Sequence, residues 1–291
     1  MSSHLPADPF EAFSVGRTPG SALAEMVQKL GPGLTDHRGL IDLPALTVLF
    51  DDIGGVAFYT AAPESSMQAR LSMSMLDRPE TDEVLEATAR LRMTSPGYGL
   101  TAVDIAGRDG RLLCTGSARN VRVGRSVENE AEHFDLAEPV PADRLPAVAA
   151  PDPALPGRTV IEAIAAGELP AGRIAELLGM RLQIVDDAPE VHCATAPWEG
   201  NVMGTMHGGV IAAAVAQGIS FGAQWHTRPG AGYQLVDFTI DFLRSPAVDG
   251  REVTVRITPI KLGRRLSLFA ADLYDGSLLL AHATAGARFD V

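Results

Sequence analysis

The stretch Asn201–Gly209, which reads NVMGTMHGG, ends in two glycines and runs straight into an apolar segment. Glycine has no Cβ, so a ligand can approach the backbone of Gly208 and Gly209 closely. If the apolar segment is a helix, its first N–H groups have no partner within the helix and lie at the positive end of its dipole. Such N–H groups can bind a carbonyl oxygen that becomes an oxyanion. The stretch therefore predicts an oxyanion-binding turn, the alternative being an ordinary tight turn before a buried helix.

Composition limits the classes of protein to which the chain can belong. Its 291 residues are enough for two domains, and the apolar fraction of 46% is that of a globular protein. No apolar run is long enough to span a bilayer and the N-terminus has no secretory signal, so we expect a cytoplasmic protein that does not bind membranes. The formal charge of −12 argues against a nucleic-acid partner. Cys114 and Cys193 have apolar neighbours, which indicates buried thiols rather than a disulfide or a metal site.

Two apolar helices are predicted, over 43–60 and 210–225, and strand-like stretches follow each of them. A further helix is predicted over 21–30 from the spacing of its apolar residues. The predicted strands are 66–76, 83–93, 99–105 and 111–123 in the first half, and 179–185, 190–196, 233–243, 252–260, 265–274 and 278–288 in the second, where short helices are also predicted over 159–166 and 171–178.

The order of turn, apolar helix, strands and hairpin occurs twice along the chain. Gly39 corresponds to Gly204 (204 − 39 = 165), and Asp36 corresponds to Asn201 at the same shift. The two Asp-Gly hairpin turns are 275 − 109 = 166 residues apart. A shift that drifts by only one residue over about seventy residues predicts an internal duplication, although the first half is expected to lack the strands that precede the turn in the second half.

These patterns divide the chain into four segments. A lead-in with the helix at 21–30 occupies residues 1–33, and the first repeat occupies 34–125. Residues 126–157 are rich in proline and acidic residues and have no periodicity, so we interpret them as a linker. The second repeat occupies 158–291.

An antiparallel sheet around one apolar helix, whose N-terminus follows Asn-x-x-Gly-x-x-His-Gly-Gly, resembles the hotdog fold. The motif is similar to that of the PaaI-like acyl-CoA thioesterases, and the resemblance covers about residues 34–123 and 158–291. It implies an α+β protein, a tandem (double) hotdog in which two 4HBT-type domains are fused. It also implies hydrolysis of an acyl-CoA thioester without a cofactor or metal, and further association into a homo-oligomer of double-hotdog chains.

The resemblance places the catalytic acid nine residues after the motif histidine. Counting from His207 gives Ala216, which is no acid, whereas counting from Asp42, the counterpart of His207, gives Asp51. Asp51 would lie roughly 12 Å along its own helix from the first turn, too far to act there. In the family the two helices run antiparallel, which implies that Asp51 meets Gly208 in one composite site per chain.

The resemblance also implies a role for each residue of that site. Asp51 would act as general base or as nucleophile. The N–H of Gly208, with that of Gly209, would stabilise the oxyanion. Asn201 would hold the water or the carbonyl group, or serve only the turn, and His207 would fix the turn through its ring nitrogens.

Other side chains are expected around these. Asp52 is the alternative base if the helix register differs by one residue, and Gln68 is expected to contact the substrate. The phosphates of coenzyme A require basic residues. The basic residues expected near them, unless they only form solvated turns, are Lys261, Arg264, Arg265 and Arg244.

Three other interpretations were weighed against a thioesterase. A fused hotdog could bind acyl-CoA without turnover, since each half lacks some site residues, and the test is whether Asp51 faces Gly208. A dehydratase of this fold would resemble Asp-x-Asn-x-x-His, which the sequence does not contain. A zinc site from His192, Cys193 and His207 lacks a recognised ligand spacing.

Overall fold

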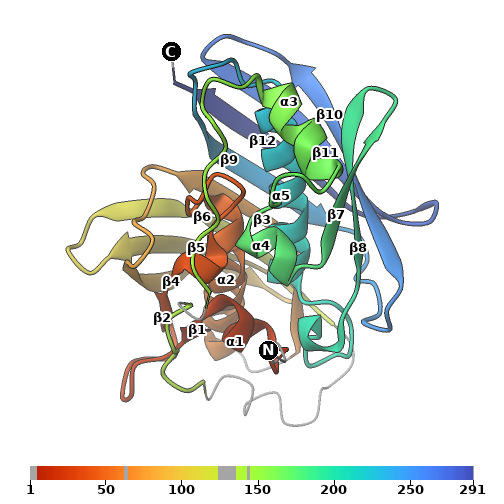
Figure 1. Ribbon diagram of the computed structural model, residues 1–291. Helices are drawn as coiled ribbons and strands as arrows, with labels where there is room; N and C mark the ends of the chain where they lie inside the picture. The colour runs from red at the N-terminus through yellow and green to blue at the C-terminus, as the bar shows by residue number, and fades with distance from the viewer. Residues whose placement is uncertain (1–4, 62–64, 124–135, 143–144, 291) are drawn as a thin grey trace.

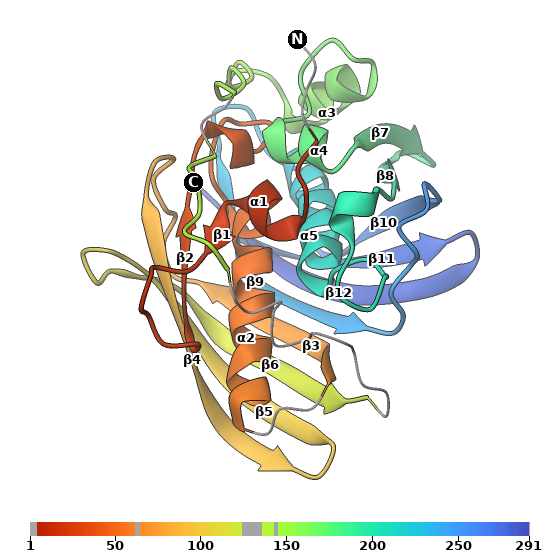
Figure 2. The same ribbon diagram turned by 90° about the horizontal axis from the view of Figure 1, so that it is seen from below.

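The computed structural model describes residues 5–61, 65–123, 136–142 and 145–290. Their strands form one 12-stranded antiparallel sheet in the order β1-β2-β4-β5-β6-β3-β9-β12-β11-β10-β8-β7. Two long helices, α2 (Thr47–Ala61) and α5 (Gly208–Trp225), lie next to each other in the middle, and the two halves of the sheet curve around them (Figures 1 and 2). This is the tandem hotdog architecture expected from the sequence.

The first half of the sheet contains β1 (Val15–Gly16), β2 (Glu25–Lys29), β3 (Ser66–Met75), β4 (Val84–Ser95), β5 (Tyr98–Gly107) and β6 (Leu112–Arg122). The second contains β7 (Met180–Val185), β8 (Ala188–Ala194), β9 (Tyr233–Phe242), β10 (Glu252–Lys261), β11 (Leu266–Asp275) and β12 (Leu278–Phe289). The shorter helices are α1 (Pro9–Phe13), α3 (Gly157–Ala165) and α4 (Arg173–Leu177), with 3-10 turns η1 (Pro32–Leu34), η2 (Leu43–Leu46) and η4 (Pro197–Glu199).

The two halves of the sheet have the same connectivity. Read from its two ends, the sheet runs β1-β2-β4-β5-β6-β3 and β7-β8-β10-β11-β12-β9, so each strand has a counterpart. The halves join where β3 pairs with β9, and Ser72 lies opposite Thr239 there. β3 and β9 are counterparts in the two halves and run antiparallel to each other. The two halves of the sheet are therefore related by an approximate two-fold axis that passes between these two strands.

The turns before the two long helices confirm the duplication. Gly39 and Gly204 have left-handed φ values of 74° and 75°, a conformation that glycine adopts without strain. In the first turn the Asp36 side chain accepts the N–H groups two and four residues ahead, and Asn201 does the same in the second turn. The shift of 165 residues inferred from the sequence thus relates two turns with the same hydrogen bonds.

Two expectations about the N-terminal region are wrong. Residues 21–30 do not form a helix, because Glu25–Lys29 pair with β4 as a strand, with Met26 buried beneath it. Pairing with a neighbouring strand overrides the local helical spacing. The first half also does not lack the strands that precede the turn, since β1 and β2 are the counterparts of β7 and β8. The other predicted helices and strands are confirmed to within a few residues at their ends.

Residues 136–142 of the predicted linker run along the first half. The carbonyl of Ala137 accepts the Arg17 N–H, and the carbonyl of Ala142 accepts the Gly33 N–H at 2.7 Å. Lys29 forms an ion pair with Glu138 at 2.7 Å. Residues 126–135 and 143–144 of the predicted linker lie outside the described residues, and the four segment limits stay predictions.

The N-terminal turns of α2 and α5 approach each other closely at Gly209. A Cβ placed on Gly209 would lie 2.6 Å from the Val48 Cα, so only glycine fits at this crossing. The Thr47 hydroxyl donates a hydrogen bond of 2.8 Å to the Gly209 carbonyl. The crossing therefore fixes the first turn of α5 against α2. In the described part of the chain, no helix has the length and apolar character needed to cross a membrane.

Replacing Gly209 with alanine is expected to force the two helices apart and to lower the free energy of unfolding by about 1–3 kcal/mol, the usual cost of overpacking. Urea denaturation measures this. Gly200→Ala is the matched control, because its Cβ would meet only the Pro197 carbonyl at 3.2 Å and the Val248 side chain at 3.6 Å. Equal free energies of unfolding for the two variants would contradict a close contact between α2 and α5 at Gly209.

Candidate active site

The turn before α5 is held by its own residues and by η4. The Asn201 Oδ1 accepts the N–H groups of Met203 at 2.9 Å and of Thr205 at 3.3 Å. The His207 N–H donates to the Glu199 carbonyl at 2.8 Å. The side-chain oxygen of Asn201 is thus used inside the turn, which leaves its amide nitrogen as the group that could contact a ligand.

His207 caps α5 through its ring. Its Nδ1 accepts the N–H of Gly209 at 3.0 Å, so the second N–H of the helix is satisfied by the cap. No acceptor is found for the N–H of Gly208 in the described part of the chain. The first N–H of α5 is therefore available at the positive end of the helix dipole.

Asp51 comes from the other half and lies directly over Gly208. A Cβ placed on Gly208 would lie 2.8 Å from Asp51 Oδ2, so the carboxylate occupies the space that glycine leaves. The side chain is buried, and its Oδ1 has no hydrogen-bond partner among the described residues. Burial raises the pKa of Asp51 to about 7, an effect that His207 opposes and Asp52 reinforces.

The imidazole of His207 lies between two carboxylates of α2. Its Nδ1 is 3.4 Å from Asp51 Oδ2, and its Nε2 is 3.3 Å from Asp52 Oδ2. Burial favours the neutral ring, but Asp52 and Asp51 outweigh it and raise the pKa of His207 to about 9. Nδ1 can accept the Gly209 N–H only when the ring is neutral. When the ring is protonated, Nδ1 carries a hydrogen and acts as a donor, and its nearest acceptor is then Asp51.

These groups border a cavity of about 100 Å³ between the two halves. Gln68 lies on its wall, and its Nε2 donates a hydrogen bond of 2.8 Å to the backbone carbonyl of Asp51. Gly55 makes room for this amide, since a Cβ there would lie 2.4 Å from the Gln68 Nε2. The lining residues are Asp51, Asp52, Gly55, Tyr59, Ser66, Met67, Gln68, Asn201, Val202, Met203, His207, Gly208, Phe242 and Ser245.

Two residues of the N-terminal segment, which sequence reasoning missed, complete the surroundings of His207. Phe10 of α1 meets the His207 ring edge-on, with 6.0 Å between ring centroids. Arg17 is buried and lies close enough to Asp52 for the two charges to interact. Neither residue belongs to a sequence motif. They lie at this site because β1, which stands between them in the chain, is a strand of the sheet.

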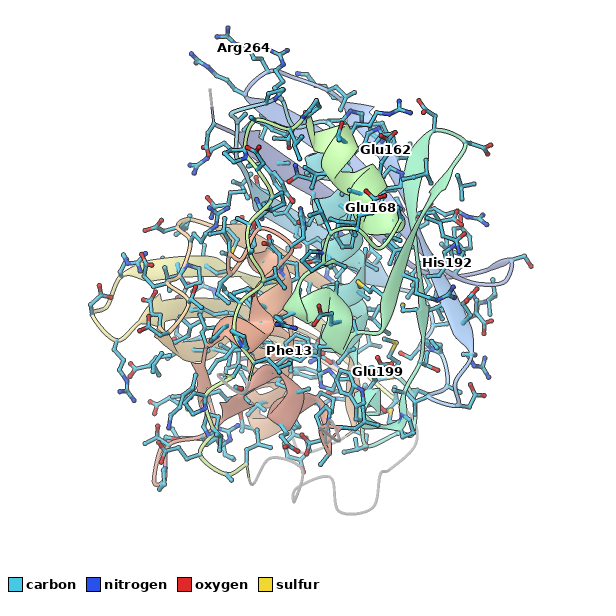
Figure 3. All side chains as sticks on the ribbon, in the orientation of Figure 1. Phe13, Glu162, Glu168, His192, Glu199 and Arg264 are labelled. Carbon is cyan, nitrogen blue, oxygen red and sulfur yellow. The ribbon has the colours of Figure 1, made fainter. Side chains whose placement is uncertain are left out.

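Arg264 and Arg265 do not line this cavity, and their expected contact with the phosphates of coenzyme A stays a prediction. Arg264 lines a different pocket together with His226, at the C-terminal end of α5. An 18-residue helix is roughly 27 Å long, so this pocket is far from Gly208. Figure 3 shows Arg264 at the opposite end of the second half from Glu199, which precedes the turn.

The equivalent position in the other half is closed. Tyr233 starts β9, where the counterpart strand starts with Ser66, and its buried ring carries the Arg38 guanidinium at 3.7 Å. Arg38 also pairs with Asp36 and Asp42, at 2.5 Å and 2.7 Å. An internal ion cluster therefore fills the place at which the first site has its cavity.

The structure does not bring the proposed zinc ligands together. His192 pairs with Glu190 and Glu252 on strands β8 and β10, whereas the neighbouring Cys193 is a buried free thiol. Among the described residues, no group of three or more His, Cys, Asp or Glu side chains could hold a metal ion.

Comparison with known proteins connects this geometry to a family. Residues 195–287 match the family described as the acyl-CoA thioesterase N-terminal domain, a region that includes the turn and all of α5. No protein of curated function matches the sequence. The match does not single out the PaaI-like branch, so that part of the resemblance stays a prediction.

Solved structures share the whole double-hotdog fold. A protein of unknown function with a hot dog fold from Alicyclobacillus acidocaldarius superposes with a TM-score of 0.60 and 13% identity, over 97% of both chains. The tesB protein of Mycobacterium avium subspecies paratuberculosis superposes with a TM-score of 0.58 and 12% sequence identity, over 96% of this chain and 97% of that one. Acyl-CoA thioesterase II from Mycobacterium marinum superposes with a TM-score of 0.55 and 11% sequence identity, over 92% of both chains. At these identities the likeness shows the fold.

Asp51→Asn is expected to raise the melting temperature at pH 8 by several degrees. Since the pKa of Asp51 is raised from 3.8 to about 7, its ionisation costs folding stability, fully so above pH 7. Asparagine avoids this cost. The increase in melting temperature over the wild type should therefore shrink toward pH 5, where the Asp51 carboxyl of the folded wild-type protein is protonated. Asp104→Asn, a half-buried carboxylate bonded to Thr115, is the control and should show no such pH-dependent gain. An Asp51→Asn variant that melts below the wild type at pH 8 would contradict the assignment.

Proposed function

We propose that this chain is a hotdog-fold acyl-CoA thioesterase, a thioester hydrolase that cleaves an acyl-CoA at one composite site between its halves. The first half supplies the acid Asp51, and the second supplies the oxyanion-binding N–H of Gly208. Neither half has both groups. The position of the Asp51 carboxylate over Gly208, with one oxygen unpartnered, carries this proposal.

The proposed reaction begins with the thioester carbonyl oxygen bound by the Gly208 N–H. This N–H lies at the start of α5, so it stabilises the negative charge that develops when the carbonyl carbon is attacked. Asp51 Oδ1 takes a proton from water as the water attacks, the tetrahedral intermediate then expels the CoA thiolate, and the proton passes from Asp51 to the thiolate sulfur. The products are the free acid and the thiol of CoA. Direct attack by Asp51, followed by hydrolysis of the anhydride, uses the same two groups.

Burial of the Asp51 carboxylate suits it to act as a general base. A carboxylate with an ordinary pKa is a weak base, whereas one with a pKa of about 7 accepts a proton more readily and is still largely ionised at slightly alkaline pH. Gln68 supports the same role, since its hydrogen bond to the Asp51 carbonyl braces this turn of α2. Asn201 lines the same cavity, and its amide nitrogen is proposed to orient the water or the carbonyl group.

The direct test is release of the CoA thiol from a panel of acyl-CoAs, from acetyl through long-chain and aryl groups. Asp51→Asn is expected to lower kcat by about 10²–10⁴-fold, the usual share of a general base. The wild-type rate should rise with pH through about 7 as Asp51 ionises. Asp104→Asn is the matched control and should keep the wild-type rate. Binding of acyl-CoA without thiol release from any substrate would instead support a silent binding protein.

A further inference from the structure

The two acids at the start of α2 reach different atoms of one imidazole. Asp51 lies against Nδ1 of His207 and over Gly208, whereas Asp52 lies against Nε2, 3.3 Å away. The proposed reaction needs one acid, and Asp51 meets its geometric requirements. Asp52 is nevertheless buried, and an ionised carboxylate out of water is costly unless it has a partner.

The partners of Asp52 come from both halves and from the N-terminal segment. His207 faces it from the start of α5, and the charge of Arg17 faces it from the residue after β1. Arg17 is itself held in place, because its Nη1 donates to the backbone carbonyls of Ala22 and Glu25 at 3.1 Å and 2.7 Å. Asp52 therefore links a fixed cation to the ring that caps α5.

Orientation of this ring decides what the first turn of α5 can do. In the neutral ring, Nδ1 accepts the Gly209 N–H when the hydrogen is on Nε2. In the protonated ring, which the raised pKa of His207 favours, Nδ1 faces Asp51 as a donor. Nε2 carries a hydrogen in both states. A carboxylate beside Nε2 faces this hydrogen in both states of the ring and holds the ring plane, the role such acids have beside other functional histidines. Phe10 closes another side of the ring, so the ring cannot turn freely to find another partner.

We propose that Asp52 is a positioning residue, which holds the Nε2 side of His207 so that the ring keeps its place at the start of α5 and the Gly208 N–H stays aimed at the substrate carbonyl. This inference rests on the proposed function for its effect on rate. Asp52 then acts through His207 and touches no reacting atom. Its loss should affect the bound transition state more than substrate binding.

The kinetic test compares Asp52→Ala with Asp52→Asn in the full chain, using the best acyl-CoA of the panel. Alanine should lower kcat by about 10–100-fold with little change in KM, as expected for a group that orients another. Asparagine keeps an oxygen that can accept from Nε2 and should restore most of kcat. Asp272→Ala is the matched control, because Asp272 holds His282 at 2.7 Å on an exposed strand, and it should leave the rate unchanged.

A spectroscopic test separates this inference from the proposed function. The ring nitrogens of ¹⁵N-histidine-labelled protein are titrated by NMR, with the His207 signal identified by its absence in His207→Gln. The groups facing the ring are Asp52 and Asp51 from α2 and Asp8 before α1, and Asp52 has the largest effect in raising the His207 pKa. The midpoint should therefore fall further in Asp52→Asn than in Asp51→Asn.

The outcomes differ for the two claims. Wild-type protein that releases no thiol would overturn the proposed function, while the NMR titration would still test the contact between Asp52 and His207. A folded Asp52→Ala variant with wild-type kcat would overturn the positioning role. A His207 midpoint that is unchanged in Asp52→Asn would overturn it as well. Loss of kcat that asparagine restores, together with the lowered midpoint, would support it.

Discussion

The close crossing of α2 and α5 at Gly209 is the constraint on which the rest of the site depends. With no side chain at this position, the backbone of α5 comes within contact of Val48, and the Thr47 hydroxyl bonds to the Gly209 carbonyl. One turn further along α2, Asp51 consequently lies over Gly208. The site is therefore a product of helix packing, and the antiparallel sheet serves to hold the two helices at this distance.

Duplication supplied two such crossings, and the two halves have since diverged in complementary ways. Both turns keep the same backbone hydrogen bonds and a left-handed glycine, which indicates that the turn is required for folding. Only the second turn has His207 and the two glycines, and only the first helix has the acids. The equivalent position in the other half holds Arg38, Asp42 and Tyr233, joined by ion pairs and a ring contact.

Much of this could be predicted from the sequence because the signals are local. Period-two apolar patterns and Asp-Gly turns identified the strands of both halves, and the shift between Gly39 and Gly204 identified the repeat. The pairing of Asp51 with Gly208 came from family resemblance, since nothing local connects residues so far apart. The strand at 25–29 was missed because its burial comes from pairing with β4. Phe10 and Arg17 were missed because their contacts depend on that strand.

The central claim is that two folded halves build one working site per chain. Isothermal titration with a thioether analogue of acyl-CoA, which cannot be hydrolysed, counts these sites directly. The structure predicts one analogue bound per chain, since Tyr233 and Arg38 occupy the second position. A stoichiometry of two per chain would contradict the account, because it would mean that the half without the facing acid and glycine still binds the substrate.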